Sequence, residues 1–260
     1  MGYVVSDSDA VEYLYTKHGT AKDMKEAVRQ SVEAGLNVRC TFRSPDSYVL
    51  PLRELVEEGG LSEEVIDNRV RDILRVKFLV GLFDEPYQTD LEGADKEVEK
   101  KENLEVALQS SRESLVLLKH EQNTLPLNLS EIKKIAVCGP NADESSYALS
   151  HYGPLAVDVV TVLQGIKNKV KDKAEVLYAK GCELVDDNWP ESELIDYPLT
   201  EQEKNEIDKA VANVNQADVA VVVLGGGQRT CGENKSRTSL ELPGRQLDLL
   251  KAVYATGKPV

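Results

Sequence analysis

The stretch that most constrains the fold is an unbroken apolar run in the second half of the chain, Val219-Ala220-Val221-Val222-Val223-Leu224. Six consecutive apolar residues, most of them valine, are typical of a β-strand that is buried on both faces. The run leads into a polar loop, 225–243, and then into a helical pattern at 246–254. A buried strand followed by a loop and a helix indicates an α/β protein.

The same alternation of strand and helix runs through the rest of this half. Residues 182–199, which include Trp189 and several acids, lack a regular period and are interpreted as an irregular excursion. The other segments predict an open α/β layer. The predicted strands are 115–118, 135–138 and 176–178, and the predicted helices are 104–112, 161–170 and 200–217.

The N-terminal part begins with a strand–helix–strand pattern. Residues 3–5 form a short apolar run that suits a buried strand, 21–36 has helical spacing, and 37–42 suits a second strand. This order is the parallel unit, which normally has a right-handed crossover. Two further helices are predicted at 48–58 and 61–82.

Local signals mark the ends of these helices. Gly35 lies where a left-handed turn would end the first of them. Gly59-Gly60 breaks the second, and Ser62 is the expected N-cap of the third.

A dense run of Asp, Glu and Lys, interrupted by Pro86 and Gly93, predicts a solvated interdomain linker at 85–103. The chain then divides into a first domain at 1–84 and a second at 104–260. Residues 3–5 start a strand at once, and Lys258-Pro259-Val260 has the form of another strand that is just beginning. We therefore expect both ends to be cut from a longer protein.

The totals exclude several classes of function. A net charge of −14 argues against a nucleic-acid-binding surface, which needs a basic patch. No apolar run is long enough to cross a bilayer, so no membrane partner is expected. The N-terminus lacks the form of a signal peptide, which leaves the compartment unknown.

The residue types that bind metals are dispersed. The 4 cysteines form no CxxC pair, and the 3 histidines are far apart. Free buried thiols are expected, and no metal is expected. A disulfide between Cys182 and Cys231 cannot be argued from their spacing.

Two stretches could carry chemistry. Asp7 follows the strand at 3–5, and in parallel α/β folds the loops at the carboxyl ends of strands hold the active groups. The alternative is that Asp7 or Asp9 simply caps the next helix, which is the better interpretation of this stretch alone. The loop 225–243 also follows a buried strand, and its length favours a function over a plain surface loop. Its Gly225-Gly226-Gly227 lacks the spacing of a nucleotide-binding loop.

Two acids at the ends of strands in two domains fit one reaction in particular. Glycoside hydrolysis uses a pair of carboxylates, which in retaining enzymes lie about 5–5.5 Å apart. One is the nucleophile, and the other acts first as an acid and then as a base.

Several motifs, in order along the chain, together resemble glycoside hydrolase family 3. They are Gly2-Tyr3-Val4-Val5-Ser6-Asp7, Glu113-Ser114-Leu115-Val116-Leu117-Leu118-Lys119 with Leu125-Pro126-Leu127, Lys134-Ile135-Ala136-Val137-Cys138-Gly139-Pro140-Asn141-Ala142, Tyr152-Gly153-Pro154, and Gly232-Glu233 with Ser239-Leu240-Glu241-Leu242-Pro243-Gly244-Arg245-Gln246.

The resemblance implies a fold and a site. The fold is the C-terminal end of a (β/α)8 TIM barrel, its strands 7 and 8, followed by an α/β sandwich that is incomplete at its C-terminus. Roughly the first six of the barrel's eight strand–helix units would precede residue 1. Asp7 is the implied nucleophile and Glu233 the implied general acid/base, with Glu241 as the fallback.

The resemblance also bears on the substrate. Ser8 and Arg229 are candidate substrate-binding residues, while Arg229, Lys235 and Arg237 either orient Glu233 or contact solvent. Many glucose-specific members have Trp after the nucleophile. Ser8 in its place favours the β-xylosidase and α-L-arabinofuranosidase branch, acting on terminal sugars of plant-derived oligosaccharides or glycosides.

Several alternatives stay open. One is a β-glucosidase of the same family, another is a non-catalytic fragment that lacks most of the barrel, and a third is a regulatory α/β binding module. No cofactor is implied, a homo-oligomer stays open, and the family's common location is periplasmic or secreted.

Overall fold

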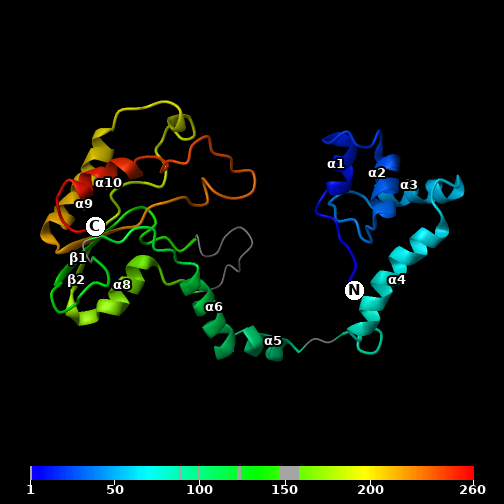
Figure 1. Ribbon diagram of the computed structural model, residues 1–260, viewed down its shortest axis with the longest axis horizontal. Coiled ribbons are helices and arrows are strands. Elements are labelled where there is room, and N and C mark those ends of the chain that lie inside the picture. Colours follow the sequence, from blue (N-terminus) through cyan, green and yellow to red (C-terminus); the bar gives the residue numbers. More distant parts are fainter. Residues whose placement is uncertain (1, 88–89, 99, 122–123, 147–157) are drawn as a thin grey trace. The chain divides into compact units, whose positions relative to one another are not determined.

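The computed structural model describes residues 2–87, 90–98, 100–121, 124–146 and 158–260 of the 260-residue chain. The chain forms two compact units, Met1–Leu115 and Val116–Val260 (Figure 1). Each unit has hydrophobic clusters of its own. The motif Tyr152-Gly153-Pro154 lies outside the described residues.

The described part of the first unit is mainly helical (Figure 1). The helices predicted at 21–36, 48–58 and 61–82 are confirmed, with ends that differ by one to three residues. Two more helices cover residues 91–98 and 101–113, so much of the segment predicted as a linker is helical. The helices are α1 (Ala10–Thr16), α2 (Met24–Ala34), α3 (Asp46–Glu57), α4 (Glu63–Leu79), α5 (Leu91–Val98) and α6 (Lys101–Glu113).

The ends of α2 and α4 follow from local sequence. The Asp23 carboxylate accepts a 2.8 Å hydrogen bond from the backbone N–H of Glu26, which caps the start of α2. Gly35 ends the helix with φ 114°, in the left-handed region as predicted. Ser62 occupies the N-cap of α4, although its side chain makes no capping bond.

The core of the first unit lies around α2. Its Ala27, Val28 and Val32 are almost fully buried, and Leu55 of α3 and Leu61 pack in the same region. These α2 positions repeat at the spacing of one helical face, which is why a single helix can organise the unit.

The two strands predicted in this unit are reduced to one parallel bridge, between Val5 and Val38. The expectation that 3–5 is buried is wrong, because Tyr3, Val4 and Val5 are 40%, 56% and 50% exposed. A strand is buried by neighbours on both sides and both faces. In the described part of the first unit only the 37–41 segment lies alongside, so the apolar side chains stay open to solvent.

The second unit contains a parallel sheet with the strand order β2-β1-β3. Its strands are β1 (Lys134–Cys138), β2 (Glu175–Ala179) and β3 (Val219–Val222). In register, Val137 lies between Tyr178 of β2 and Val221 of β3. The small parallel sheet with helices confirms the predicted α/β class.

Helices cover both faces of this sheet, with α8 (Val162–Val170) on one and α9 (Glu201–Gln216) and α10 (Gln246–Tyr254) on the other (Figure 1). Ala136 and Cys138 of β1 belong to the cluster with α9 and α10, whereas Ile135 and Val137 belong to the cluster with α8. This alternation is the two-residue period of a strand that is buried on both faces. Two short 3-10 turns, η1 (Lys171–Lys173) and η2 (Glu191–Glu193), complete the described elements.

One predicted strand of this region is wrong. Residues 115–118 are not in a strand, and Leu115, Val116, Leu117 and Leu118 are 80%, 74%, 64% and 91% exposed. An apolar run becomes a strand only where another strand satisfies its backbone groups. No strand among the described residues pairs with this segment.

The four cysteines provide a test of this core. All four are free, and Cys138 and Cys182 are buried as predicted. Cys40 and Cys231 are exposed, so the expectation of buried thiols is wrong for these two. Burial raises the pKa of Cys138 to about 11 and that of Cys182 to about 12. Since the thiolate is the reactive form, we expect two thiols to react rapidly with Ellman's reagent in the native protein, and the other two only after unfolding. The double substitution Cys40→Ser and Cys231→Ser should remove the rapid phase; four rapid thiols would contradict the described core.

Candidate functional site

The first candidate residue, Asp7, lies between the Val5–Val38 bridge and the start of α1. Its side chain is exposed, and its Oδ1 accepts a 2.7 Å hydrogen bond from the backbone N–H of Ser8. Its backbone carbonyl accepts a 3.2 Å bond from the N–H of Ala10. The carboxylate therefore faces solvent from a turn whose backbone is held at both sides.

The segment that carries Asp7 is hydrogen-bonded to the 38–41 segment. The N–H of Ser6 donates to the carbonyl of Val38 at 2.9 Å, and the N–H of Cys40 donates to the Ser6 hydroxyl at 2.9 Å. The N–H of Asp9 donates to the carbonyl of Cys40 at 3.2 Å. Ser8, the candidate sugar-binding residue, has its hydroxyl 3.7 Å from the Cys40 thiol.

Asp9 occupies the N-cap position of α1, but its side chain makes no capping bond. It has a left-handed backbone, φ 56°, and its Oδ1 instead accepts a 2.6 Å bond from the Thr41 hydroxyl. This hydrogen bond, with the nearby Arg43 guanidinium, holds the pKa of Asp9 below its usual range. Asp9 thus occupies the capping position of α1, but its side chain does not cap the helix.

The second candidate residue, Glu233, lies in the long loop of the other unit. The first part of this loop is anchored to buried groups: the amide of Gln246, which is fully buried, bonds both the N–H and the carbonyl of Gly225, at 2.8 and 3.0 Å. Asn141, which follows β1, donates to the carbonyl of Gly226 at 3.1 Å. Because β1 and β3 are parallel, the loops that follow them leave the same edge of the sheet.

Close packing at that edge requires glycine in one position. Gly139 follows β1 with φ 107°, and a Cβ placed there would lie 2.1 Å from the carbonyl oxygen of Val223. Only glycine allows such an approach and such a conformation.

The later part of the loop is held by Glu193, from the excursion predicted as irregular. Arg237 donates to Glu193 Oε1 at 2.7 Å, and the N–H and hydroxyl of Thr238 both donate to Oε2 at 2.9 Å. The guanidinium of Arg237 also lies 5.7 Å from the centre of the Trp189 ring. Arg237 therefore ties the loop to the excursion, a role different from the two that the sequence suggested for it.

Glu233 lies between these two anchored parts. It is exposed, and its neighbours Gly232 and Asn234 both have positive φ, 128° and 60°. Arg229 and Lys235 are exposed as well. The fallback residue Glu241 is exposed, and its carbonyl accepts a 2.6 Å bond from Arg237.

The Glu193 anchor can be tested by substitution. Its pKa lies below its ordinary value of 4.5, chiefly because the Thr238 N–H donates to it, and also because of Arg237. A carboxylate with a lowered pKa stabilises the folded state fully above that ordinary value and loses this effect as the pH falls through the folded value. At pH 7 we expect Glu193→Gln to exchange the backbone amides of 225–243 faster than the wild type does. As the pH falls below about 4.5, exchange in this loop should become faster in the wild type, whereas in Glu193→Gln this pH dependence should be absent. Glu191→Gln, in the same short turn, is the matched control; equal exchange in all three proteins at pH 7 would rule out the anchor.

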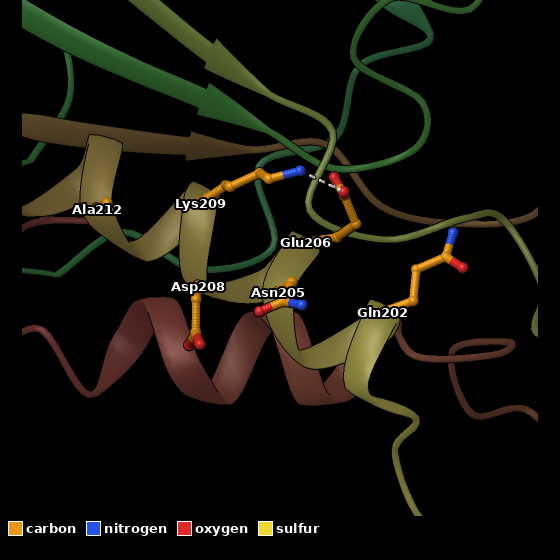
Figure 2. A pocket seen from close by; sticks show the side chains of 6 residues that line it. All are labelled: Gln202, Asn205, Glu206, Asp208, Lys209 and Ala212. Atoms are coloured by element: carbon orange, nitrogen blue, oxygen red, sulfur yellow. Dashed lines mark hydrogen bonds and ion pairs between the residues drawn. The ribbon is translucent and has the colours of Figure 1, made fainter.

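Two hollows lie in the surface of the described residues. The larger, about 610 Å³, lies on the outer side of α9 and is lined by Gln202, Asn205, Glu206, Asp208, Lys209 and Ala212. Figure 2 shows Glu206 pointing toward Lys209, to which it is ion-paired at 2.6 Å, and Asp208 pointing elsewhere. The hollow is lined by a single helix and brings no two free acids together, so it has the character of a solvated helix surface.

The other hollow, about 430 Å³, lies beside the Asp7 segment and is lined by residues of 4–14 and 30–36, among them Val4, Ser6 and Leu14. Asp7 does not line it. Among the described residues, no group of three or more His, Cys, Asp and Glu is placed to hold a metal ion.

Sequence reasoning missed the residues that support these loops. Glu193 was one of several acids in a segment without a period. Gln246 was the last residue of a family motif and the first of a predicted helix, and neither signal indicated that it would hold the loop. Glu12 and Arg39 gave no signal either, because they are 27 residues apart and form their ion pair only in the folded unit.

The fold and these loops define an α/β domain with a long loop at the carboxyl ends of its strands, preceded by a helical unit that presents an acid. Residues 115–260 match the glycosyl hydrolase family 3 C-terminal domain. The chain belongs to glycosyl hydrolase family 3.

Similarity to individual members extends over both units. A periplasmic beta-glucosidase of Salmonella typhimurium is 37% identical over 100% of this chain and 34% of its own length. A beta-xylosidase of Formosa agariphila is 32% identical over 100% of this chain and 35% of its own. A beta-glucosidase from Listeria innocua, solved in complex with glucose, superimposes with a TM-score of 0.80 at 32% identity, covering 100% of this chain and 32% of that one.

The chain therefore spans about a third of the length of the relatives it matches. Among the described residues, no helix is both long and apolar enough to cross a membrane.

Proposed function

We propose that this chain is part of a retaining, exo-acting glycoside hydrolase that removes a terminal sugar from oligosaccharides or glycosides. The observation that carries the proposal is the position of Asp7. Asp7 follows an extended segment that forms a parallel bridge with the next extended segment of the chain. Helices α1 and α2 lie between these two segments in the sequence. Catalytic groups of parallel α/β folds are found at such carboxyl ends.

The same observation supports the domain assignment. Residues 1–84 would be the last two strand–helix units of a TIM barrel, 85–103 the connection, and 104–260 the sandwich domain. The Val5–Val38 bridge, with α1 and α2 between its two segments, follows the strand–helix–strand order that a barrel repeats. Similarity to the family's glycosidases over the whole chain, and not only over 115–260, supports the same assignment.

In this mechanism the Asp7 carboxylate attacks the anomeric carbon while Glu233 donates a proton to the leaving oxygen. The product is a covalent glycosyl-enzyme. Glu233, now ionised, then removes a proton from water, which attacks the same carbon and releases the sugar with its original configuration. Because Asp7 must be ionised and Glu233 protonated at the start, the two acids need different surroundings.

For the sugar we propose xylose or arabinose, because Ser8 directly follows Asp7 at the position where many glucose-specific members of the family have Trp. A β-glucosidase is the second candidate, favoured by the 37% identity to the Salmonella typhimurium enzyme. A periplasmic or secreted location is proposed on the same relative.

The experiment is a comparison of rates on nitrophenyl β-xyloside, α-L-arabinofuranoside and β-glucoside. It uses both this 260-residue chain and the full-length polypeptide that contains it. We expect the xyloside or the arabinofuranoside to have the highest kcat/KM. A higher value on the glucoside would select the second candidate. Activity in neither polypeptide on any of the three would overturn the proposed function, and activity in the longer one alone would make this chain a non-catalytic fragment of the enzyme.

A further inference from the structure

A buried ion pair lies behind the turn that carries Asp7. Glu12, on α1, and Arg39, between α2 and α3, have side chains only 3% and 4% exposed. Arg39 Nη2 donates to Glu12 Oε1, and it also donates to the Ser47 hydroxyl at 2.9 Å. The guanidinium carbon lies 5.5 Å from the centre of the Tyr48 ring.

This pair is a costly way to stabilise a small unit. Burial removes the hydration of both charges, and two apolar residues of similar size are often as good or better. Moreover, Glu12 Oε2 and Arg39 Nε are buried without a hydrogen-bond partner among the described atoms, which adds to the cost. Stability alone therefore gives little reason for the pair.

The pair is connected to the Asp7 turn through Thr41. Arg39 Nη2 lies 3.5 Å from the Thr41 hydroxyl, and that hydroxyl donates the 2.6 Å bond to Asp9. Asp9 has a left-handed backbone, φ 56°, a conformation that is sparsely populated outside glycine. A strained residue keeps its conformation only where its surroundings hold it, and such residues occur often at functional sites.

Resting on the proposed function, we propose that Glu12, Arg39, Thr41 and Asp9 form a positioning network that fixes the turn presenting Asp7 to the sugar. None of the four needs to touch the substrate. Ser6 is fixed on one side of Asp7 by its bonds to Val38 and Cys40, and the network fixes Asp9 on the other. A nucleophile must lie close to the attacked carbon and in line with the leaving group, and an error of about 1 Å can cost about 100-fold in rate.

The test uses Asp9, whose side chain is 23% exposed and can be changed with little damage to the core. Asparagine tolerates the left-handed region and keeps an oxygen for Thr41, whereas alanine offers neither. In the full-length polypeptide we expect Asp9→Asn to keep kcat within about twofold, and Asp9→Ala to lower it about tenfold or more with KM nearly unchanged. The rate of formation of the covalent intermediate, followed with a 2-fluoro glycoside, should fall by the same factor.

Arg39→Lys examines the buried end of the network, because lysine keeps the charge but loses the planar guanidinium, whose Nη2 contacts Glu12, Ser47 and Thr41. Its matched control is Arg29→Lys, at a partly exposed ion pair with Glu26 and Glu33 on α2. We expect a tenfold or larger loss of kcat for the first and none for the second, with the unfolding midpoint of each variant measured alongside. If Arg39→Lys fails to fold, Asp9→Ala decides.

The outcomes separate this inference from the function on which it rests. Wild-type kcat in Asp9→Ala and Arg39→Lys, with Asp7→Ala inactive, would overturn the network and leave the proposed nucleophile in place. Full activity in Asp7→Ala would overturn both. Equal losses in Asp9→Asn and Asp9→Ala would also overturn the network, since asparagine retains what the network requires.

Discussion

Replacing Asp7 by alanine in the full-length polypeptide is expected to lower kcat/KM on nitrophenyl xyloside by about 10⁴-fold or more, as removal of a nucleophile does in other hydrolases. Without the carboxylate there is no group to attack the anomeric carbon, and the covalent intermediate cannot form. Because Asp7 is exposed and its side chain accepts only the adjacent Ser8 N–H, its removal should leave the fold intact.

A chemical rescue makes this prediction specific. Azide is small enough to enter the space left by the carboxylate and attack the sugar from the same side. It should restore turnover and give a glycosyl azide of inverted configuration, which NMR identifies. Asp67→Ala, at an exposed acid on α4, is the control and should keep full activity. Wild-type rates in Asp7→Ala would remove this residue from the mechanism.

Replacing Glu233 by alanine should have an effect that depends on the leaving group. General acid catalysis contributes about 10²–10⁴-fold, and it is needed most where the leaving oxygen is basic. We therefore expect a loss of this size on xylobiose and a much smaller one on dinitrophenyl xyloside, whose leaving group needs no proton. With azide present, the product should be a glycosyl azide of retained configuration, because Asp7 still forms the intermediate.

Glu241→Ala is the matched control for Glu233. Both acids are exposed and lie in the same loop, eight positions apart. If Glu241→Ala gives the dependence on the leaving group and Glu233→Ala does not, the fallback residue is the acid/base. Because Gln246 and Glu193 anchor the loop on either side of Glu233, we expect both variants to keep the fold.

Much of the second unit was predictable because its signals are local. An apolar run flanked by polar loops, as at Val219–Leu224, indicates a strand wherever it occurs. The cap of α9 at Thr200 is also local, with its hydroxyl and Glu203 bonding each other's backbone N–H groups across one turn. The role of Gly35 at the end of α2 was predictable for the same reason, since the end of a helix often needs a residue that tolerates positive φ.

The errors came from segments whose structure depends on distant partners. Residues 3–5 and 115–118 have the composition of buried strands, yet they are exposed because strands are completed by neighbours that sequence does not place. The sequence suggested that Arg237 either orients Glu233 or contacts solvent, whereas the structure pairs it with Glu193, 44 positions away.

By itself, the sequence determined the α/β class, the helices of the second unit and the three strands of its sheet, and the family, because these depend on periodicity and on motifs carried by short stretches. Only the tertiary structure decided what supports the two candidate acids. The Glu12–Arg39 pair, the Thr41–Asp9 bond, and the Gln246 and Glu193 anchors each join residues from different elements. Polar contacts of this kind depend on distances of a few ångströms between groups far apart in the chain, and no local pattern specifies them.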